Sequence, residues 1–297
     1  MVTLPFSLAH FRVEKHFKLS KQSFGSWIAD QGKGIVLGAV LGAMALGLVY
    51  VSVLFFPLGW WVVCASLLIL FSIVLAQLTP ILLIPLFFKL KPMEEGTLKA
   101  RLLALCERFG IDVKEVFHIG LGEKTEKGNA AFLGLGRTKR IVIGDTLYEK
   151  FPAEEVEAVF AHELGHQVHN DLWKGIGVSS FILYLCFGLA NFAMVQTIGH
   201  SPLAGSPYQM FLFFTVLSVI QMPFNVFQAA YSRAREWAAD GFAQIRIGQG
   251  SELASALERL TYQNHGQFKP NAILEFLSFS HPAPWRRITT LRNSPPA

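Results

Sequence analysis

Two histidines and a glutamate form the most chemically informative stretch of the chain. His162 and His166 are four residues apart, and Glu163 follows the first of them. On an α-helix this spacing returns after about 40° of rotation, so both imidazoles lie on one face and can bind one Zn²⁺. Glu163 would then lie beside the metal, where it can take a proton from a zinc-bound water. The pattern is typical of a zinc metallopeptidase.

The residues around this motif predict the helix that it requires. Pro152, Glu154 and Glu155 stand where such a helix would begin, which matches the preference of a first turn for proline and negative charge. Apolar residues then continue a helical pattern through the motif, namely Ala158, Val159, Ala161 and Leu164. The alternative is a surface helix whose histidines bind nothing, because so short a pattern also arises by chance.

A hydrolytic zinc site needs a third protein ligand and leaves its fourth position to water. Our candidate is Glu236, which lies one helical turn before Asp240. Asp240 would accept a hydrogen bond from a ligand histidine and so fix its tautomer. The alternative for this pair is a solvated helix face flanked by arginines. His169 is the rival ligand, but three residues after His166 it would be turned away from the metal.

The composition indicates a membrane protein. Of the 297 residues, 52% are hydrophobic and 16% are charged, and the stretches 34–88 and 175–232 contain no charged residue. Each stretch is too long for one span of about 20 residues and suits two. Pro57 with Gly59 breaks the first stretch, and the turn-forming segment 199–208 breaks the second. We therefore expect a mainly α-helical integral membrane protein with about four transmembrane helices, near 35–56, 60–79, 176–198 and 209–230.

The lysines and arginines predict how the chain is oriented. Neither turn between spans carries one, whereas five precede the first span, namely Arg12, Lys15, Lys18, Lys21 and Lys33. Because basic segments stay in the cytoplasm, both termini and the histidine motif would face it. The membrane would be the bacterial inner membrane or, in a eukaryote, the endoplasmic reticulum. The net charge of +5 requires no nucleic-acid partner, since basic residues beside anionic lipid account for it.

These features divide the chain into five segments. Residues 1–34 form a cytoplasmic or interfacial segment, 35–88 a membrane hairpin, 89–175 the catalytic part with the zinc helix, 176–230 a second hairpin, and 231–297 a catalytic segment with the third ligand.

A small sheet or hairpin is expected just ahead of the zinc helix. Residues 116–120, 131–135 and 140–144 are short, β-branched or aromatic runs punctuated by glycine. An edge strand there would either pair with an extended peptide substrate or be purely structural.

Spaced segments along nearly the whole chain carry a family resemblance. They are residues 4–7, 17–22, 30–34, 128–132 and 138–147, the histidine motif, Glu236 with Asp240, and Ser280-His281-Pro282 followed by Arg287. In this order they resemble the type I CAAX prenyl proteases, integral-membrane zinc metallopeptidases that cleave near the C-terminus of isoprenylated proteins. The resemblance implies one Zn²⁺ per chain, a peptide or prenylated protein as substrate, and contact with membrane lipid.

The resemblance also implies a role for each matching residue. The zinc ligands would be His162, His166 and Glu236. Glu163 would be the base, and Asp240 would accept a hydrogen bond from a ligand histidine. Asn129 would bind the substrate backbone. Arg287 would stabilise the site or the developing oxyanion, and its alternative is a surface charge at a helix end. His281 is either part of the site or the N-terminal element of a helix without chemistry.

Three classes of function stay open at this point. The first is a membrane zinc endopeptidase that removes the C-terminal tripeptide of isoprenylated proteins, or cleaves similar peptides, with Glu163 as general base. The second is a quality-control protease that resembles the bacterial heat-shock membrane zinc proteases. The third is a non-catalytic membrane scaffold or inactive fragment, against which the intact ligands argue. Family members carry about seven spans, with several ahead of residues 4–7, so we expect the chain as it stands to process a farnesylated peptide poorly. The sequence does not set the oligomeric state.

Overall fold

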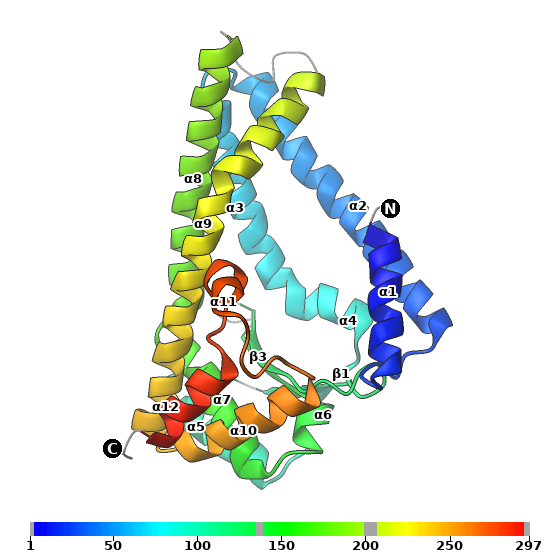
Figure 1. The fold of residues 1–297 in the computed structure, drawn as a ribbon, viewed down its shortest axis with the longest axis vertical. Helices are drawn as coiled ribbons and strands as arrows, with labels where there is room; N and C mark the ends of the chain where they lie inside the picture. The colour runs from blue at the N-terminus through cyan, green and yellow to red at the C-terminus, as the bar shows by residue number, and fades with distance from the viewer. Residues whose placement is uncertain (1–2, 114, 135–138, 199–206, 294–297) are drawn as a thin grey trace.

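Long apolar helices rise from a smaller part that contains a sheet and several shorter helices (Figure 1). This architecture comes from a computed structural model, which describes residues 3–113, 115–134, 139–198 and 207–293. The predicted turn residues 199–206 lie outside the described residues, as do Leu135 of a predicted strand and Thr138 of the family segment.

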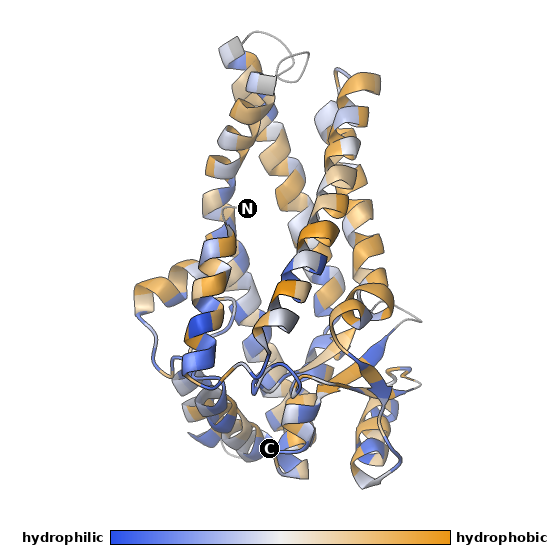
Figure 2. Ribbon diagram, turned by 90° about the vertical axis from the view of Figure 1, so that its right-hand side faces the viewer, coloured by the Kyte–Doolittle hydropathy of each residue, from blue (hydrophilic) through white to orange (hydrophobic). Residues whose placement is uncertain are grey.

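Among the described residues, four helices are long and apolar enough to cross a membrane, as the sequence predicted. They are α2 (Phe24–Phe55), α3 (Trp60–Leu78) with its continuation through a π-helical turn (Thr79–Leu83) into α4 (Ile84–Phe87), α8 (Asp171–Ile198) and α9 (Pro207–Gly241). Figure 2 shows them predominantly hydrophobic over much of their length, whereas the part that holds the sheet is more mixed. The predicted class, a helical membrane protein with a small sheet, is confirmed.

Three of these helices extend beyond the spans that hydropathy marks. Helix α2 begins at Phe24, where Ser23 caps it by accepting a hydrogen bond from the Ser26 amide. Helix α8 begins at Asp171, directly after Asn170, whose φ of 55° breaks the chain from the preceding helix. Helix α9 continues without interruption past residue 230 to Gly241. An apolar run marks the membrane-facing part of a helix, but the helix ends only where capping or backbone geometry ends it. For this reason one helix carries both a membrane span and Glu236.

The sheet has four strands in the order β1-β2-β4-β3. Strand β2 (Val116–Ile119) runs parallel to β4 (Arg140–Gly144), while β1 (Leu90–Pro92) and β3 (Ala130–Leu133) flank them in antiparallel pairing. Three of the strands fall where the sequence predicted them. Strand β1 escaped prediction because its three residues, Leu-Lys-Pro, carry no alternating apolar pattern. Strand β3 is an edge strand among the described residues.

Helix α7 (Ala153–Val168) is the buried centre of the sheet-containing part. Its residues Val156, Ala158, Phe160 and Leu164 join the main hydrophobic core. The core also takes side chains from the sheet and from α5 (Thr97–Arg108), α10 (Gly250–Gln263) and α12 (Pro284–Asn293). The other α-helices of the described residues are α1 (Thr3–His16), α6 (Asp145–Tyr148) and α11 (Ala272–Ser278), and a π-helical segment (Phe242–Ile247) follows α9.

A glycine allows α7 to pack tightly against α9. A Cβ atom at Gly165 would lie 3.1 Å from the Ala239 Cα and 3.1 Å from the Phe242 Cβ. A larger residue would therefore push the two helices apart. Because Gly165 lies between the two motif histidines on α7, and Ala239 lies next to Asp240 on α9, this contact fixes the distance between the two halves of the candidate site.

Candidate metal centre

His162 and His166 from α7 meet Glu236 from α9. The His162 Nε2 lies 3.4 Å from the Glu236 Oε2, and the His166 Nε2 lies 3.4 Å from the Glu236 Oε1. The two imidazole rings are nearly perpendicular, at 89°, with centroids 4.9 Å apart. One ligand atom from each of the three residues lies within 4.8 Å of the others. The helical spacing of the histidines therefore converges, as expected, on a single point beside the glutamate.

The donor set and its environment fit a divalent metal ion. The Glu236 Oε2 is buried and has no hydrogen-bond partner among the described residues. The Arg287 Nη1 lies 3.2 Å and the His162 Nε2 3.4 Å from this oxygen, so it is ion-paired, but it keeps a lone pair that a metal cation can use. Two imidazole nitrogens with one carboxylate form a ligand set that occurs in catalytic zinc sites. The residues present thus match what such an ion requires.

On the His162 side, a buried carboxylate and a buried guanidinium hold the imidazole. The His162 Nδ1 lies 2.9 Å from the Asp240 Oδ1. Arg287 donates to both oxygens of Asp240, at 2.8 and 2.7 Å, and its Nη1 lies 3.2 Å from the Glu236 Oε2. All four side chains are buried. Arg287 on α12 thus links the two acidic residues of α9 and is no surface charge.

On the His166 side, the supporting carboxylate comes from a membrane helix. The His166 Nδ1 lies 2.9 Å from the Asp171 Oδ2, and Arg235 donates to the Asp171 Oδ1 at 3.3 Å. Neither Asp171 nor Arg235 was expected at the site from the sequence. A signal was present, since Asp171 is an acid placed directly after a helix break and five residues past His166. The turn at Asn170 carries it back toward the imidazole.

The two other candidate site histidines, His169 and His281, differ in their contacts. His169 follows the end of α7, and its ring packs against Phe242, so the geometry gives no support to its role as rival ligand. His281, which precedes α12, points its Nε2 at the Glu236 Oε1 from 3.4 Å. Its side chain remains 64% exposed, so solvent or a substrate can reach it. The structure therefore places His281 at the cluster.

Asn129 lies at the sheet edge. Asn129 immediately precedes β3, and its side chain is exposed. Its backbone carbonyl accepts a hydrogen bond from the Gly144 amide at 2.8 Å. This bond anchors the start of the edge strand to β4.

Burial and nearby charged groups shift the pKa values of two residues of α7, Glu163 and His162. Burial raises the pKa of the Glu163 carboxyl above its ordinary value. Burial lowers the pKa of His162, but hydrogen bonds to Asp240 and Glu236 outweigh it and raise that pKa to about 9. A carboxylate with a raised pKa is a better proton acceptor near neutral pH. Glu163 is therefore suited to general-base chemistry.

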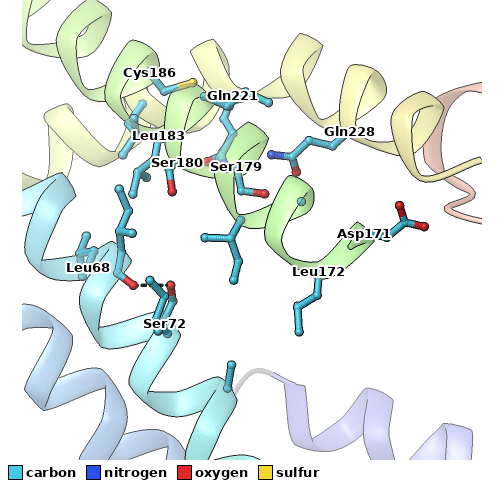
Figure 3. Close-up of a pocket in the computed structure, with 17 residues that line it drawn as sticks. Leu68, Ser72, Asp171, Leu172, Ser179, Ser180, Leu183, Cys186, Gln221 and Gln228 are labelled. Atoms are coloured by element: carbon cyan, nitrogen blue, oxygen red, sulfur yellow. Dashed lines mark hydrogen bonds between the residues drawn. The ribbon is translucent and has the colours of Figure 1, made fainter. Parts of the chain in front are cut away.

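A cavity of about 610 Å³ begins at Asp171 and extends between α3, α8 and α9 (Figure 3). Its walls are mainly apolar, with hydroxyl and amide groups from Ser72, Ser179, Ser180, Gln221 and Gln228. It adjoins the Nδ1 side of His166, through Asp171, and not the Nε2 side that faces Glu236.

Two family profiles match the chain in succession. The profile described as peptidase family M48 matches residues 92–294, which hold all the residues of the cluster. The profile described as the N-terminal part of CAAX prenyl proteases, with five membrane helices, matches residues 1–89. The described residues of that stretch contain two of the candidate spans.

Similar proteins are known from yeast, plants, animals and bacteria. CAAX prenyl protease 1 of Saccharomyces cerevisiae is 28% identical over 98% of this chain and 69% of its own length. The uncharacterized metalloprotease YhfN of Bacillus subtilis is 27% identical over 97% of this chain and 69% of its own length. The crystal structure of S. mikatae Ste24p superposes with a TM-score of 0.87 at 27% identity, covering 98% of this chain and 72% of that one.

Proposed function

We proceed from the fact that the chain belongs to peptidase family M48, and we propose that it removes the C-terminal tripeptide of isoprenylated proteins, or cleaves similar peptides, at a Zn²⁺ ion. The family makes the chain a membrane metallopeptidase. One observation carries the assignment of the ligands. Glu236, on a helix that also holds a membrane span, places one carboxylate oxygen 3.4 Å from the Nε2 of each motif histidine. The names of the yeast, plant and animal relatives support the CAAX substrate class.

The proposed chemistry divides between the ion and Glu163. A Zn²⁺ ion held by His162, His166 and Glu236 would polarise the scissile carbonyl and lower the pKa of a bound water towards about 7. Glu163 accepts a proton as water attacks the carbonyl carbon, and it then returns that proton to the leaving amine. Its raised pKa supports both transfers, since the protonated form must persist until the amine departs.

The residues around the ligands position them and the substrate. Asp240 and Asp171 each accept a hydrogen bond from the Nδ1 of one histidine, which leaves the Nε2 free for the metal. Arg287 donates two hydrogen bonds to Asp240, so we propose that its role is to hold the carboxylates of Asp240 and Glu236 in position. The substrate backbone adds to the outer edge of β3, where Asn129 binds it.

We extend the proposal to orientation and organisation. The basic residues before the first span and the absence of Lys and Arg from both turns support a site that faces the cytoplasm. The membrane is the endoplasmic reticulum in a eukaryote and the inner membrane in a bacterium. We retain the five segments 1–34, 35–88, 89–175, 176–230 and 231–297 as functional units, although α9 crosses the last boundary as one helix.

Metal analysis and paired peptides test this function. Purified protein should contain one zinc per chain and cleave an S-farnesylated CAAX peptide in preference to the same peptide with S-methylcysteine. An unfolded membrane protein serves as the substrate of the quality-control alternative. Preferential degradation of that protein, with no preference for the farnesyl group, would replace the CAAX assignment and leave the metallopeptidase assignment intact.

A further inference from the structure

Helix α11 is amphipathic in the reverse sense to a normal surface helix. Its glutamate, Glu275, is buried, while its large apolar side chains are exposed: Ile273 by 68%, Leu274 by 52%, Phe276 by 58% and Leu277 by 46%. At about 100° per residue, these four span an arc of about 160°, and Glu275 lies on the opposite side. An outward apolar face with an inward carboxylate is what contact with an apolar partner requires.

Polar contacts fix this helix in its reversed orientation. The Glu275 carboxylate accepts a hydrogen bond from the buried Ala283 amide at 3.0 Å. Asn271 caps the N-terminus by accepting hydrogen bonds from the amides of Ile273 and Leu274. Reversing the helix would break the buried bond and leave an amide without a partner, so the exposed face is built in.

The same helix is joined to the candidate metal centre. Arg233, on α9 one turn before Glu236, donates to the carbonyls of Glu275, Phe276 and Phe279 at 3.0, 3.3 and 2.7 Å. Helix α11 packs directly against α9, as Figure 1 also shows. Four residues after Leu277, His281 approaches the Glu236 Oε1 to 3.4 Å. At no more than about 3.6 Å per residue, the apolar face ends within about 15 Å of the residue at the cluster.

We infer that the outward face of α11 binds the isoprenoid chain of the lipidated substrate. This inference rests on the proposed function, because in a CAAX sequence the prenylated cysteine directly precedes the tripeptide that is removed. The lipid therefore hangs from the residue next to the scissile bond and must find an apolar surface close to the metal. The exposed face formed by Ile273, Phe276 and Leu277 ends four residues before His281, which lies at the cluster, and meets that need.

The cavity at Asp171 is the rival location for the lipid. Asp171, which lines this cavity, contacts the Nδ1 of His166, whereas the Nε2 of His166 faces Glu236. The cavity therefore lies on the side of the His166 ring that is away from the metal position. The Ser72 hydroxyl there already donates to the Ile69 carbonyl, but an isoprenoid chain would take water away from the amides of Gln221 and Gln228. The α11 face presents no such group.

A ratio of two rates isolates the lipid contact. For Ile273→Ser, Phe276→Ser and the wild type, kcat/KM is measured in detergent on the S-farnesyl peptide and on its S-methyl counterpart. Each substitution should lower the farnesyl-to-methyl ratio about tenfold, since burying one large apolar side chain is worth about one order of magnitude in affinity. Phe192→Ser, which removes a ring 63% exposed on α8, is the matched control and should leave the ratio unchanged.

Each other outcome overturns the inference in a different way. An unchanged ratio in both variants would mean that α11 contacts the bilayer or another surface. An equal loss on both peptides would mean that the helix only supports the site. A wild type without farnesyl preference would remove the proposed function as well, and that result is read from the wild type alone.

Photocrosslinking checks the same contact without turnover. A peptide whose isoprenoid chain carries a benzophenone is bound to Glu163→Gln, and the labelled residues are mapped by mass spectrometry. Labelling should fall on residues 273–277. Labelling of Leu183 or Leu217 in the cavity would assign the lipid to the rival location.

Discussion

His162 and His166 lie on one face of α7, yet different parts of the chain hold their Nδ1 atoms. Asp240 and Arg287 hold His162 in a closed network inside the sheet-containing part. His166 depends on Asp171, the first residue of a membrane helix, and on Arg235, whose side chain is 28% exposed. The metal centre therefore has one anchor that is fully buried and one whose arginine is partly exposed to solvent.

This difference predicts unequal responses to mutation. A buried pair suffers most when one partner is removed, because the other is left as an uncompensated charge. A partly exposed partner can turn towards water and loses less. Removing Asp240 leaves the buried Arg287 without its main partner, whereas removing Asp171 leaves Arg235 free to be solvated. The His162 side should be the more sensitive of the two.

The largest effect is expected from Glu163→Gln, which leaves both anchoring networks intact. The substitution keeps the shape of the side chain but removes the proton acceptor, so turnover should fall by about 10²–10⁴-fold. Zinc content should stay near that of the wild type, as measured by atomic emission on the same sample. Wild-type turnover would exclude Glu163 as the base, and loss of zinc would mean that it binds metal.

Glu236→Ala removes the one carboxylate that both sides share. It should lower zinc affinity and activity together. The loss should exceed the factor of about 10–100 that is typical when a residue hydrogen-bonded to a metal ligand is mutated. Competition with a chelator of known affinity measures the first quantity. Full zinc occupancy in this variant would reject Glu236 as the third ligand and would direct attention to His281, which already lies 3.4 Å from it.

Asp240→Ala and Asp171→Ala test the comparison itself. Asp240→Ala should weaken zinc binding towards the upper end of the about 10–100-fold range, and Asp171→Ala towards the lower end. The same chelator competition measures both variants. An equal loss, or a larger loss in Asp171→Ala, would show that burial of the supporting network does not set the sensitivity of the metal centre.

The smallest expected single step is the change in zinc affinity produced by one unit of pH. A histidine must lose its proton to bind zinc, and hydrogen bonds to Asp240 and Glu236, working against burial, raise the pKa of His162 to about 9. Apparent zinc affinity should therefore rise by at least about tenfold per pH unit up to about pH 9. The free energy of unfolding of chelator-treated protein should change in the opposite direction and fall as pH rises. The raised pKa of His162 stabilises the fold at low pH, and this stabilisation is lost as pH approaches 9. Zinc titrations from pH 6 to 9 that show no slope would contradict the raised pKa.

The parts of the molecule that follow from local patterns were predictable. Long uncharged stretches imply membrane helices, and a four-residue histidine spacing implies convergence on one helix face, whatever the tertiary structure. The contacts of Asp171 and His281 depend on chain reversals at Asn170 and after α11, and no periodicity encodes these. Strand β1 is too short to show a pattern, and the uninterrupted course of α9 is invisible to hydropathy because its last turns are polar. The reversed burial of α11 likewise appears only once Ala283 supplies a partner for Glu275.

The central claim is that His162, His166 and Glu236 together hold one catalytic zinc. X-ray absorption at the zinc edge of the purified protein tests it most directly, because the spectrum reports the ligand atoms themselves. We expect two imidazole nitrogens and carboxylate or water oxygens at about 2.0–2.2 Å, with the imidazole signal falling by half in His166→Ala. A sulfur ligand at about 2.3 Å, or three imidazoles in the wild type, would contradict it.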